Sequence, residues 1–216
     1  MDLKTYTKQD THLFSSPARI IIAGYSNSGK SQLTSELIKK YHNSFDMILY
    51  CGTDSHPLQN DEEIGPKLTL SPEIQNPTEY AQHLDKGLLF ILDDLFLEAV
   101  QNPHVTQAFT KGRHHKISTI FITQNMFYSG KYSRNISLNA SHYILMKNRD
   151  VSQIENLARQ VFGKCRSRNL VEIYQRALTY NKYGYLLIDL SVNTPPELQL
   201  RTNIVDETEY QIVFNF

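Results

Sequence analysis

The feature that most constrains the fold of this chain is a glycine-rich loop at residues 24–31, which has the pattern Gly-x-x-x-x-Gly-Lys-Ser. The run Arg19–Ala23 before it is β-branched and apolar, as is typical of a strand buried on both faces. After it, Leu33, Leu37 and Ile38 recur at helical spacing. A glycine-rich turn between a strand and a helix directs backbone amides inward and forms an anion-binding nest. The sequence therefore predicts a phosphate-binding P-loop.

A P-loop makes ATP and Mg²⁺ the expected cofactors. We expect Lys30 to reach the β- and γ-phosphates and the Ser31 hydroxyl to bind Mg²⁺. The predicted nucleotide-binding residues belong to the loop or to the first turn of the following helix: Gly24, Ser26, Asn27, Ser28, Gly29, Lys30, Ser31 and Gln32.

Two carboxylates follow a second apolar run, Leu88–Leu92. In P-loop enzymes an aspartate at the end of a neighbouring strand supports the magnesium ion, and Asp93 is placed for that role. Asp94 is placed to accept the proton of the attacking water as a general base. The alternative is a turn that ends the strand and caps a helix, which is common for aspartate. Beside an upstream P-loop, the catalytic interpretation is the stronger one.

A third strand, predicted over Ile117–Thr123, ends at Gln124. If it lies next to the acidic strand, its carboxyl end meets the γ-phosphate, because ligands bind outside the carboxyl ends of the strands in open α/β sheets. Gln124 is then a candidate sensor that bonds phosphate or orients water. The alternative is a turn or helix cap at Asn125.

The remaining pattern alternates strands with helices, which predicts an α/β fold with a mainly parallel central sheet flanked by helices. Further strands are expected at 45–51 and 185–190, and edge strands within 198–216. Helices are expected at 96–111, near 150–162 and near 168–180. Residues 52–78, rich in Pro and Gly, are expected to form a loop. Residues 1–16 are expected to form an N-terminal arm or a short capping strand, and residues 17–216 a single ATPase domain.

Composition excludes several classes of protein. With 216 residues, of which 40% are hydrophobic, the chain can bury one sizeable core. Its two cysteines, Cys51 and Cys165, argue against a disulfide framework and a cysteine-based zinc site. No apolar run approaches the roughly 18 residues of a membrane span. We expect a soluble intracellular protein with no membrane partner.

Basic residues concentrate between residues 101 and 182, which hold 13 of the 22 Lys and Arg but three of the 22 Asp and Glu. Clusters occur at Lys111–Lys116 and Lys164–Arg168. Three interpretations remain open. The basic residues contact a DNA backbone without reading sequence, they supply an arginine to the ATP of a neighbouring subunit, or they form a solvated face.

Together these segments resemble the FtsK–HerA superfamily, and within it the poxvirus-type virion DNA-packaging ATPases of large eukaryotic DNA viruses, virophages and polinton-like viruses. The resemblance runs from about residue 17 to about residue 205. Gln124 and the Arg113-His114 pair before its strand are the more selective features. The resemblance to this superfamily depends on five segments: residues 24–31, Ile91–Asp94, Gly112–Ser118, Ile122–Asn125 and Ser133–Ile136.

The resemblance implies a RecA-like core that assembles into a hexameric ring and uses ATP to move double-stranded DNA into a preformed capsid. A capsid vertex protein is a further partner that it suggests. By the same resemblance, Lys30 and Ser31 bind phosphate and magnesium, Asp93 supports the metal, Asp94 matches the catalytic acid and Gln124 matches the sensor. Asp94 departs from the Glu of cellular FtsK and HerA members, although the viral branch often has Asp here.

The resemblance also implies an arginine finger that acts on a neighbouring subunit. Arg113 and Arg134 are the leading candidates, ahead of Arg149 and Arg201. Two other functions stay open on the residues alone. One is a P-loop ATPase that drives virion assembly without moving DNA, and the other is an interaction protein that uses ATP as a structural switch.

Overall fold

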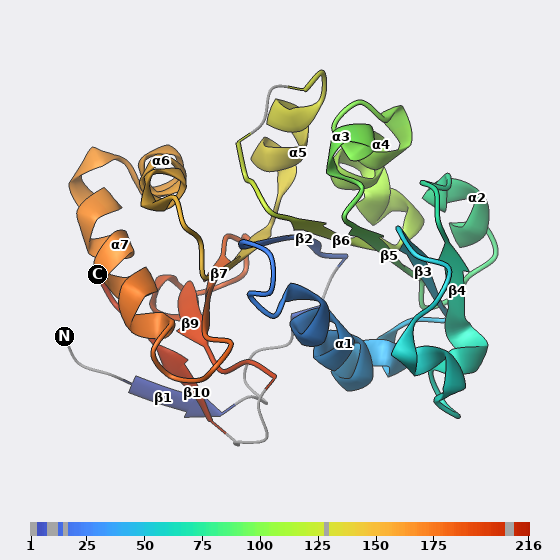
Figure 1. Ribbon diagram of the computed structural model, residues 1–216, viewed down its shortest axis with the longest axis horizontal. Coiled ribbons are helices and arrows are strands. Elements are labelled where there is room, and N and C mark those ends of the chain that lie inside the picture. The colour runs from blue at the N-terminus through green and yellow to red at the C-terminus, as the bar shows by residue number, and fades with distance from the viewer. Residues whose placement is uncertain (1–3, 8–12, 15–16, 128–129, 206–209) are drawn as a thin grey trace.

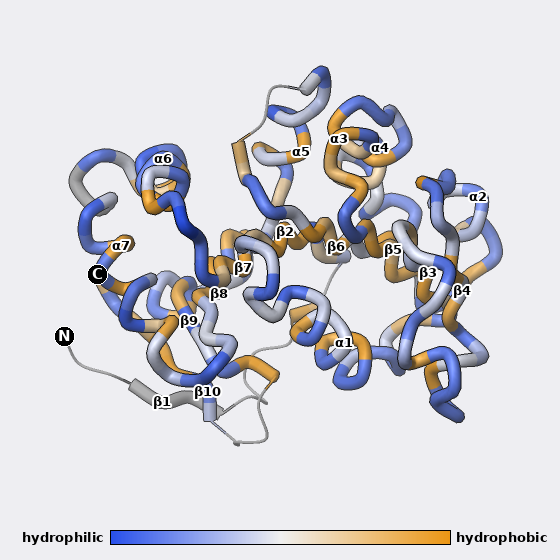
Figure 2. Tube along the Cα trace, in the orientation of Figure 1, coloured by the Kyte–Doolittle hydropathy of each residue, from blue (hydrophilic) through white to orange (hydrophobic). Residues whose placement is uncertain are grey.

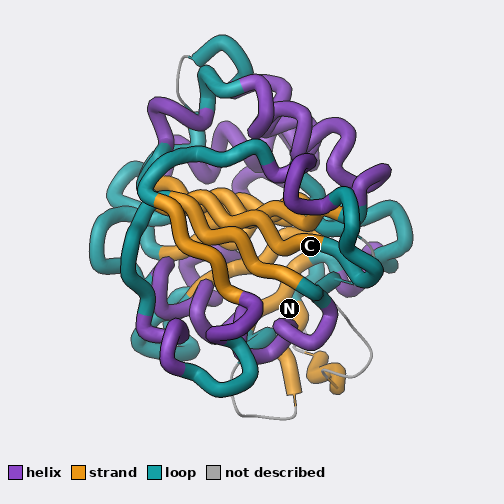
Figure 3. The backbone as a smooth tube through the Cα atoms, turned by 90° about the vertical axis from the view of Figure 1, so that its right-hand side faces the viewer, coloured by secondary structure: helices purple, strands orange, loops and turns teal. Residues whose placement is uncertain are grey.

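The computed structural model describes residues 4–7, 13–14, 17–127, 130–205 and 210–216. Its centre is a twisted sheet with the strand order β1-β10-β9-β8-β7-β2-β6-β5-β3-β4 (Figure 1). Figure 3 shows this sheet from the side, with helices on both faces. The mainly parallel α/β architecture expected from the alternating pattern is confirmed.

Six neighbouring strands of the sheet run parallel to one another. The P-loop strand β2 lies between β6 and β7, and the acidic strand β5 pairs with β6 on its other side. The carboxyl ends of β2, β5 and β6 therefore meet at one edge of the sheet. The bounds of the six strands are β2 Arg19–Ala23, β3 Met47–Cys51, β4 Leu68–Ser71, β5 Leu88–Asp93, β6 Ile117–Thr123 and β7 His142–Met146.

The other four strands extend the sheet beyond β7 in antiparallel fashion. The edge strands expected near the C-terminus are present as β9 and β10, but the outer edge itself is β1, which comes from the start of the chain. Strand β10 thus lies between β9 and β1. The bounds are β8 Tyr185–Asp189, β9 Leu200–Thr202, β10 Tyr210–Val213 and β1 Lys4–Thr7.

Helices bury both faces of the parallel strands. Side chains of β2 alternate between two apolar cores: Ile20 and Ile22 face the core that holds α1 (Lys30–Tyr41), and Ile21 faces the other. Figure 2 shows the resulting apolar band along the strands. The second core is covered by α2 (Pro77–Ala81), α3 (Phe96–Ala99), α4 (Pro103–Lys111), α5 (Ser133–Asn139), α6 (Val151–Phe162) and α7 (Lys164–Ala177).

The single helix expected at 96–111 is wrong, because the structure has α3 and α4 with a break between them. Oδ1 of Asn102 accepts a hydrogen bond of 2.8 Å from the His104 amide, and Pro103 occupies the first helical position. A polar cap followed by proline starts a new helix rather than continuing an old one.

The chain between 52 and 78 is more ordered than the expected loop. It contains strand β4, which pairs in parallel with β3, and two short 3₁₀ helices, Pro57–Asn60 and Gly65–Lys67. Strand β7 and helix α5 were also not predicted. The helix expected near 168–180 is present as α7 but begins earlier, at Lys164.

Candidate active site

The glycine-rich loop spans the gap between the end of β2 and the start of α1, at the carboxyl edge of the parallel strands. Its backbone is tied to two neighbouring strands, since the Gly24 amide donates to the Thr123 carbonyl and the Tyr25 amide to the Lys147 carbonyl. A Cβ atom on Gly24 would lie 2.8 Å from Cβ of Met146. Only glycine fits this close approach, and the strand–turn–helix context expected of a P-loop is present.

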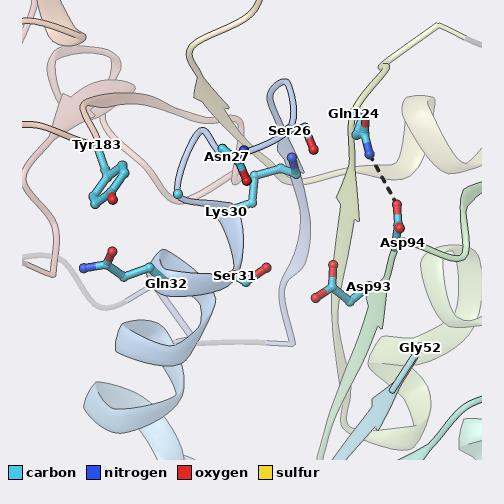
Figure 4. Close-up of a pocket in the computed structure, with 11 residues that line it drawn as sticks. Ser26, Asn27, Lys30, Ser31, Gln32, Gly52, Asp93, Asp94, Gln124 and Tyr183 are labelled. Atoms are coloured by element: carbon cyan, nitrogen blue, oxygen red, sulfur yellow. Dashed lines mark hydrogen bonds between the residues drawn. The ribbon is translucent and has the colours of Figure 1, made fainter. Parts of the chain in front are cut away.

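Lys30, the first residue of α1, lies at the mouth of the loop. Its ammonium donates hydrogen bonds of 2.8 Å to the Gly24 carbonyl and 2.9 Å to the Tyr25 carbonyl. Burial lowers the pKa of this ammonium, while the carboxylates of Asp93 and Asp94 act in the opposite direction. Lys30 and the acidic pair line the same pocket (Figure 4).

The acidic pair lies where β5 ends. Asp93 is the last residue of the strand, and Asp94 turns the chain away with a φ of 54°. Aspartate tolerates this left-handed conformation better than most residues. The Tyr50 hydroxyl, from the adjacent strand β3, donates a hydrogen bond of 2.6 Å to Oδ2 of Asp93. Burial, followed by the charge and hydrogen bond of Asp93, raises the pKa of Tyr50, so the hydroxyl stays protonated and remains a donor.

Gln124 follows β6 directly, beside the acidic strand as expected, because Asp93 pairs with Ile122 in the sheet register. Its side-chain amide lies 3.4 Å from Oδ1 of Asp94, at the long end of the hydrogen-bond range. Both side chains are exposed. The amide and the second carboxylate therefore lie side by side at the sheet edge (Figure 4).

Lys30, the acidic pair and Gln124 line one pocket of about 610 Å³. Loop and helix residues form one wall, and the ends of β3, β5 and β6 form the other (Figure 4). Two predicted residues, Gly24 and Ser28, belong to the loop but do not line the pocket. The lining consists of Ser26, Asn27, Gly29, Lys30, Ser31, Gln32, Gly52, Asp93, Asp94, Gln124 and Tyr183.

Both leading finger candidates lie outside this pocket. Arg113 is in the short 3₁₀ helix Gly112–His115 that precedes β6, at the opposite edge of the sheet. Burial, and then the charge of Arg113, lowers the pKa of Arg19 at the start of β2. Arg134 is exposed on α5 and lines a separate hollow of about 540 Å³ together with Phe127 and Leu138.

The two weaker finger candidates differ from each other. The guanidinium of Arg149 lies over the ring of Tyr25 in the phosphate-binding loop, 5.5 Å from its centroid. Arg201 is buried in β9 and pairs with the Asp189 carboxylate. A buried, paired guanidinium cannot reach a neighbouring subunit, so Arg201 is not the finger.

Three residues of the site escaped the sequence analysis: Tyr50, Gly52 and Tyr183. Gly52 has a φ of 118°, and a Cβ atom there would lie 2.0 Å from the Asp93 carbonyl oxygen. Its position directly after a predicted strand, at the same sheet edge as the loop, was an available signal. Tyr183 precedes β8 and matches no motif.

Among the described residues, no helix combines the length and the apolar character that a membrane span requires.

Comparison with solved structures shows which proteins share this fold. The genome packaging NTPase B204 from Sulfolobus turreted icosahedral virus 2, in complex with AMPPCP, is 13% identical over 93% of this chain and 99% of that chain, with a TM-score of 0.56. Its complex with ATP-gammaS is 14% identical over 86% and 96% of the two chains, with a TM-score of 0.55. The cytoplasmic domain of the Thermomonospora curvata type VII secretion ATPase EccC is 11% identical over 92% of this chain and 25% of that chain, with a TM-score of 0.54. At these identities the likeness establishes the fold.

Comparison at the level of sequence identifies the family. No curated protein sequence matches the chain significantly. The family model described as poxvirus A32 protein matches residues 6–215, nearly the whole chain. This match confirms the resemblance drawn from the P-loop, the acidic pair and Gln124. The chain belongs to the poxvirus A32 protein family.

Proposed function

We propose that this chain is an ATP-driven motor that moves double-stranded viral DNA into a preformed capsid. Its place in the poxvirus A32 family and the fold that it shares with a viral genome packaging NTPase support a viral DNA-packaging ATPase. One observation carries the catalytic part of the proposal. Lys30, Asp93, Asp94 and Gln124 come from three separate segments of the chain, and all four line one pocket.

The pocket fits the triphosphate of ATP with Mg²⁺. Lys30 and the loop amides supply positive charge for the phosphates. The Ser31 hydroxyl and the Asp93 carboxylate are oxygen donors, which Mg²⁺ prefers, and it is usually held by one or two such groups together with phosphate oxygens and water. The ion would neutralise charge on the β- and γ-phosphates. The Tyr50 hydroxyl donates to Oδ2 of Asp93 and orients the carboxylate, which would still have Oδ1 to offer to the metal or its water shell.

Hydrolysis needs a water molecule placed in line with the γ-phosphate and a group that accepts its proton. We assign proton acceptance to Asp94 and the positioning of the water to Gln124. The distance of 3.4 Å between the Gln124 amide and the Asp94 carboxylate supports this assignment, because one water molecule would be able to bond both groups. Lys30 lies across the pocket and would stabilise the negative charge that develops on the phosphate oxygens.

The DNA contact would use basic residues without reading sequence. Lys111–Lys116, which we name the basic turn, leads from the end of α4 into β6. Lys111, Arg113, His114, His115 and Lys116 are all exposed there. Exposed cations on one turn suit phosphate contacts, which supply affinity for any duplex sequence.

We further propose a hexameric ring in which an arginine of one subunit stabilises the transition state in the next, with a capsid vertex protein as the docking partner. The pocket needs such a cation, because Lys30 is the one basic side chain among its described lining residues. Arg134 and Arg113 are exposed and remain the candidates, and Arg149 joins them through its place beside the loop.

Hydrolysis measured with and without duplex DNA tests the proposal, together with mass determination in an ATP analogue. We expect DNA to stimulate hydrolysis, Lys30→Ala to abolish it, and the analogue to produce a hexamer. If DNA did not change the rate of hydrolysis and no ring formed at any protein concentration, the motor function would be wrong. That result would favour an ATPase that drives virion assembly without moving DNA. Tight ATP binding with negligible turnover, unchanged in Asp94→Asn, would indicate a nucleotide switch.

A further inference from the structure

The pocket has two ends with different chemistry. Asp93, Asp94 and Gln124 form the end where the γ-phosphate lies in the proposed function, on which the following inference rests. The opposite end is formed by Gln32 and by Tyr183, which comes from the turn before β8 (Figure 4). A triphosphate bound by the loop with its γ-phosphate at the acidic end directs the remainder of the nucleotide toward this second end.

Tyr183 packs directly on the phosphate-binding loop. A Cβ atom on Gly29 would lie 2.7 Å from Cδ1 and 2.8 Å from Cγ of the Tyr183 ring. Gly29 also has a φ of 97°, which favours glycine on its own account. The missing side chain therefore serves two purposes, because it permits the turn into α1 and lets an aromatic ring approach the loop.

A second hollow of about 180 Å³ continues from this end along α1. It shares Gly29, Gln32 and Tyr183 with the main pocket and extends past Leu33 to Glu36, one turn further along the helix. The shared residues make the two hollows neighbours. The lining of the second one is mixed in character, since it combines the apolar side chain of Leu33 with the amide of Gln32 and the carboxylate of Glu36.

We propose that this second hollow is the nucleobase subsite and that the Tyr183 ring is the wall on which the base stacks. Aromatic side chains stack on bases through their π-faces, whichever base is present. The Lys182 ammonium lies over the ring, 5.2 Å from its centroid, so the base takes the face that the lysine does not cover. Gln32 and Glu36 lie within the same hollow and can bond polar groups on the base edge.

The alternative role of Tyr183 is packing alone, in which the ring only holds Gly29 in place, and a ligand without a base separates these two roles. Inorganic tripolyphosphate with Mg²⁺ occupies the phosphate site but has no base. We expect Tyr183→Ala to weaken ATP binding by about 5- to 150-fold, which corresponds to one lost base stack. Binding of tripolyphosphate should be unchanged, and Tyr183→Phe should retain the affinity for ATP.

Calorimetric titration of the 216-residue chain with each ligand makes the measurement. Tyr210→Ala, which removes an exposed ring on β10, is the matched control and should bind both ligands as the wild type does. Equal losses for ATP and tripolyphosphate in Tyr183→Ala would assign the residue to loop packing, and no loss for either would place the base elsewhere. Both results overturn the inference while leaving the ATPase intact. A wild-type chain that bound tripolyphosphate but not ATP would overturn the inference and the proposed function together.

Discussion

The Tyr50 hydroxyl donates a hydrogen bond of 2.6 Å to Oδ2 of Asp93, across the pair of strands β3 and β5. The carboxylate that we assign to magnesium is thereby held by a side chain that does not itself line the pocket. Groups that orient a metal ligand in this way commonly change metal affinity or activity by 10- to 100-fold when removed.

Tyr50→Phe tests this support directly. The variant keeps the ring and removes the donor, so the Asp93 carboxylate is less firmly oriented. We expect hydrolysis to need about 10- to 100-fold more Mg²⁺ for half-maximal rate, measured by titrating Mg²⁺ at saturating ATP. Tyr143→Phe is the matched control, because it also removes a buried hydroxyl, one that bonds the Ser137 carbonyl. An unchanged Mg²⁺ requirement in Tyr50→Phe would show that Asp93 does not depend on the tyrosine.

Gly52→Ala should disrupt the acidic end of the pocket. The new Cβ atom would meet the Asp93 carbonyl oxygen at 2.0 Å, and the φ of 118° is strained for alanine. We expect the free energy of unfolding to fall by about 1–3 kcal/mol or more, which lowers Tm by about 2–12 °C. Hydrolysis should fall as well, because Asp93 and Asp94 must shift.

Gly163→Ala is the control for the strain alone. Gly163 has a φ of 77°, but nothing lies within 4 Å of a Cβ atom built there. Its thermal unfolding should show a smaller loss of stability, with hydrolysis kept. If Gly52→Ala and Gly163→Ala lost the same stability and the same hydrolysis, the close contact with Asp93 would not be the reason for glycine at position 52.

Removing charge from the basic turn should weaken DNA binding. Binding of a duplex to Lys111→Gln/Arg113→Gln would be followed over a range of salt concentrations. Each lost phosphate contact lowers the slope of log Kobs against log salt by about 0.9. Lys39→Gln/Arg159→Gln removes two exposed cations elsewhere and should keep the wild-type slope. If both double variants gave one and the same slope, the basic turn would not be the DNA contact.

Asp189→Asn should reveal a buried ion pair that stabilises the antiparallel part of the sheet. Burial by itself would raise the pKa of Asp189, but the hydrogen bond and charge of His142 and the charge of Arg201 outweigh it and hold the pKa well below its usual range. A depressed carboxyl pKa stabilises the fold above the unfolded pKa of about 4, and this contribution is lost as pH falls through the folded value.

Urea unfolding at two pH values measures this contribution. At pH 7 we expect Asp189→Asn to lose about 3–5 kcal/mol, because Arg201 stays buried without its partner charge. The difference from wild type should shrink as pH falls below about 4. Glu155→Gln breaks the exposed pair with Arg159 and should cost less than about 1 kcal/mol. A difference that did not change with pH would rule out the charge of Asp189 as its source.

The core of the site was predictable because it depends on local patterns and on one rule of sheet geometry. The P-loop needs a strand, a glycine-rich turn and a helix, all within a short stretch of sequence. Asp93 and Gln124 each follow an apolar strand, and the carboxyl ends of adjacent parallel strands meet. Once β5 and β6 are neighbours in the sheet, Asp93 and Gln124 must therefore lie close together.

Other parts of the fold depend on contacts that no local pattern reveals. Strand β7 is short, and its place beside β2 is set by pairing between residues far apart in sequence, such as Ile20 with His142. The burial of Arg201 depends in the same way on its pairing with Asp189. Tyr50 and Tyr183 act through the neighbours that the fold provides, and nothing in their own sequence context marks them.

Strand β1 pairs with β10, so that Lys4 lies opposite Val213. During synthesis β1 leaves the ribosome long before β10, so it must wait without this hydrogen-bonding partner while the strands between them are made. Closure of this edge is the longest-range step in sequence, and loop-closure entropy makes such pairings late and slow. A chain that stalled before β10 would display two unpaired edges, β9 and β1, open to pairing with other chains.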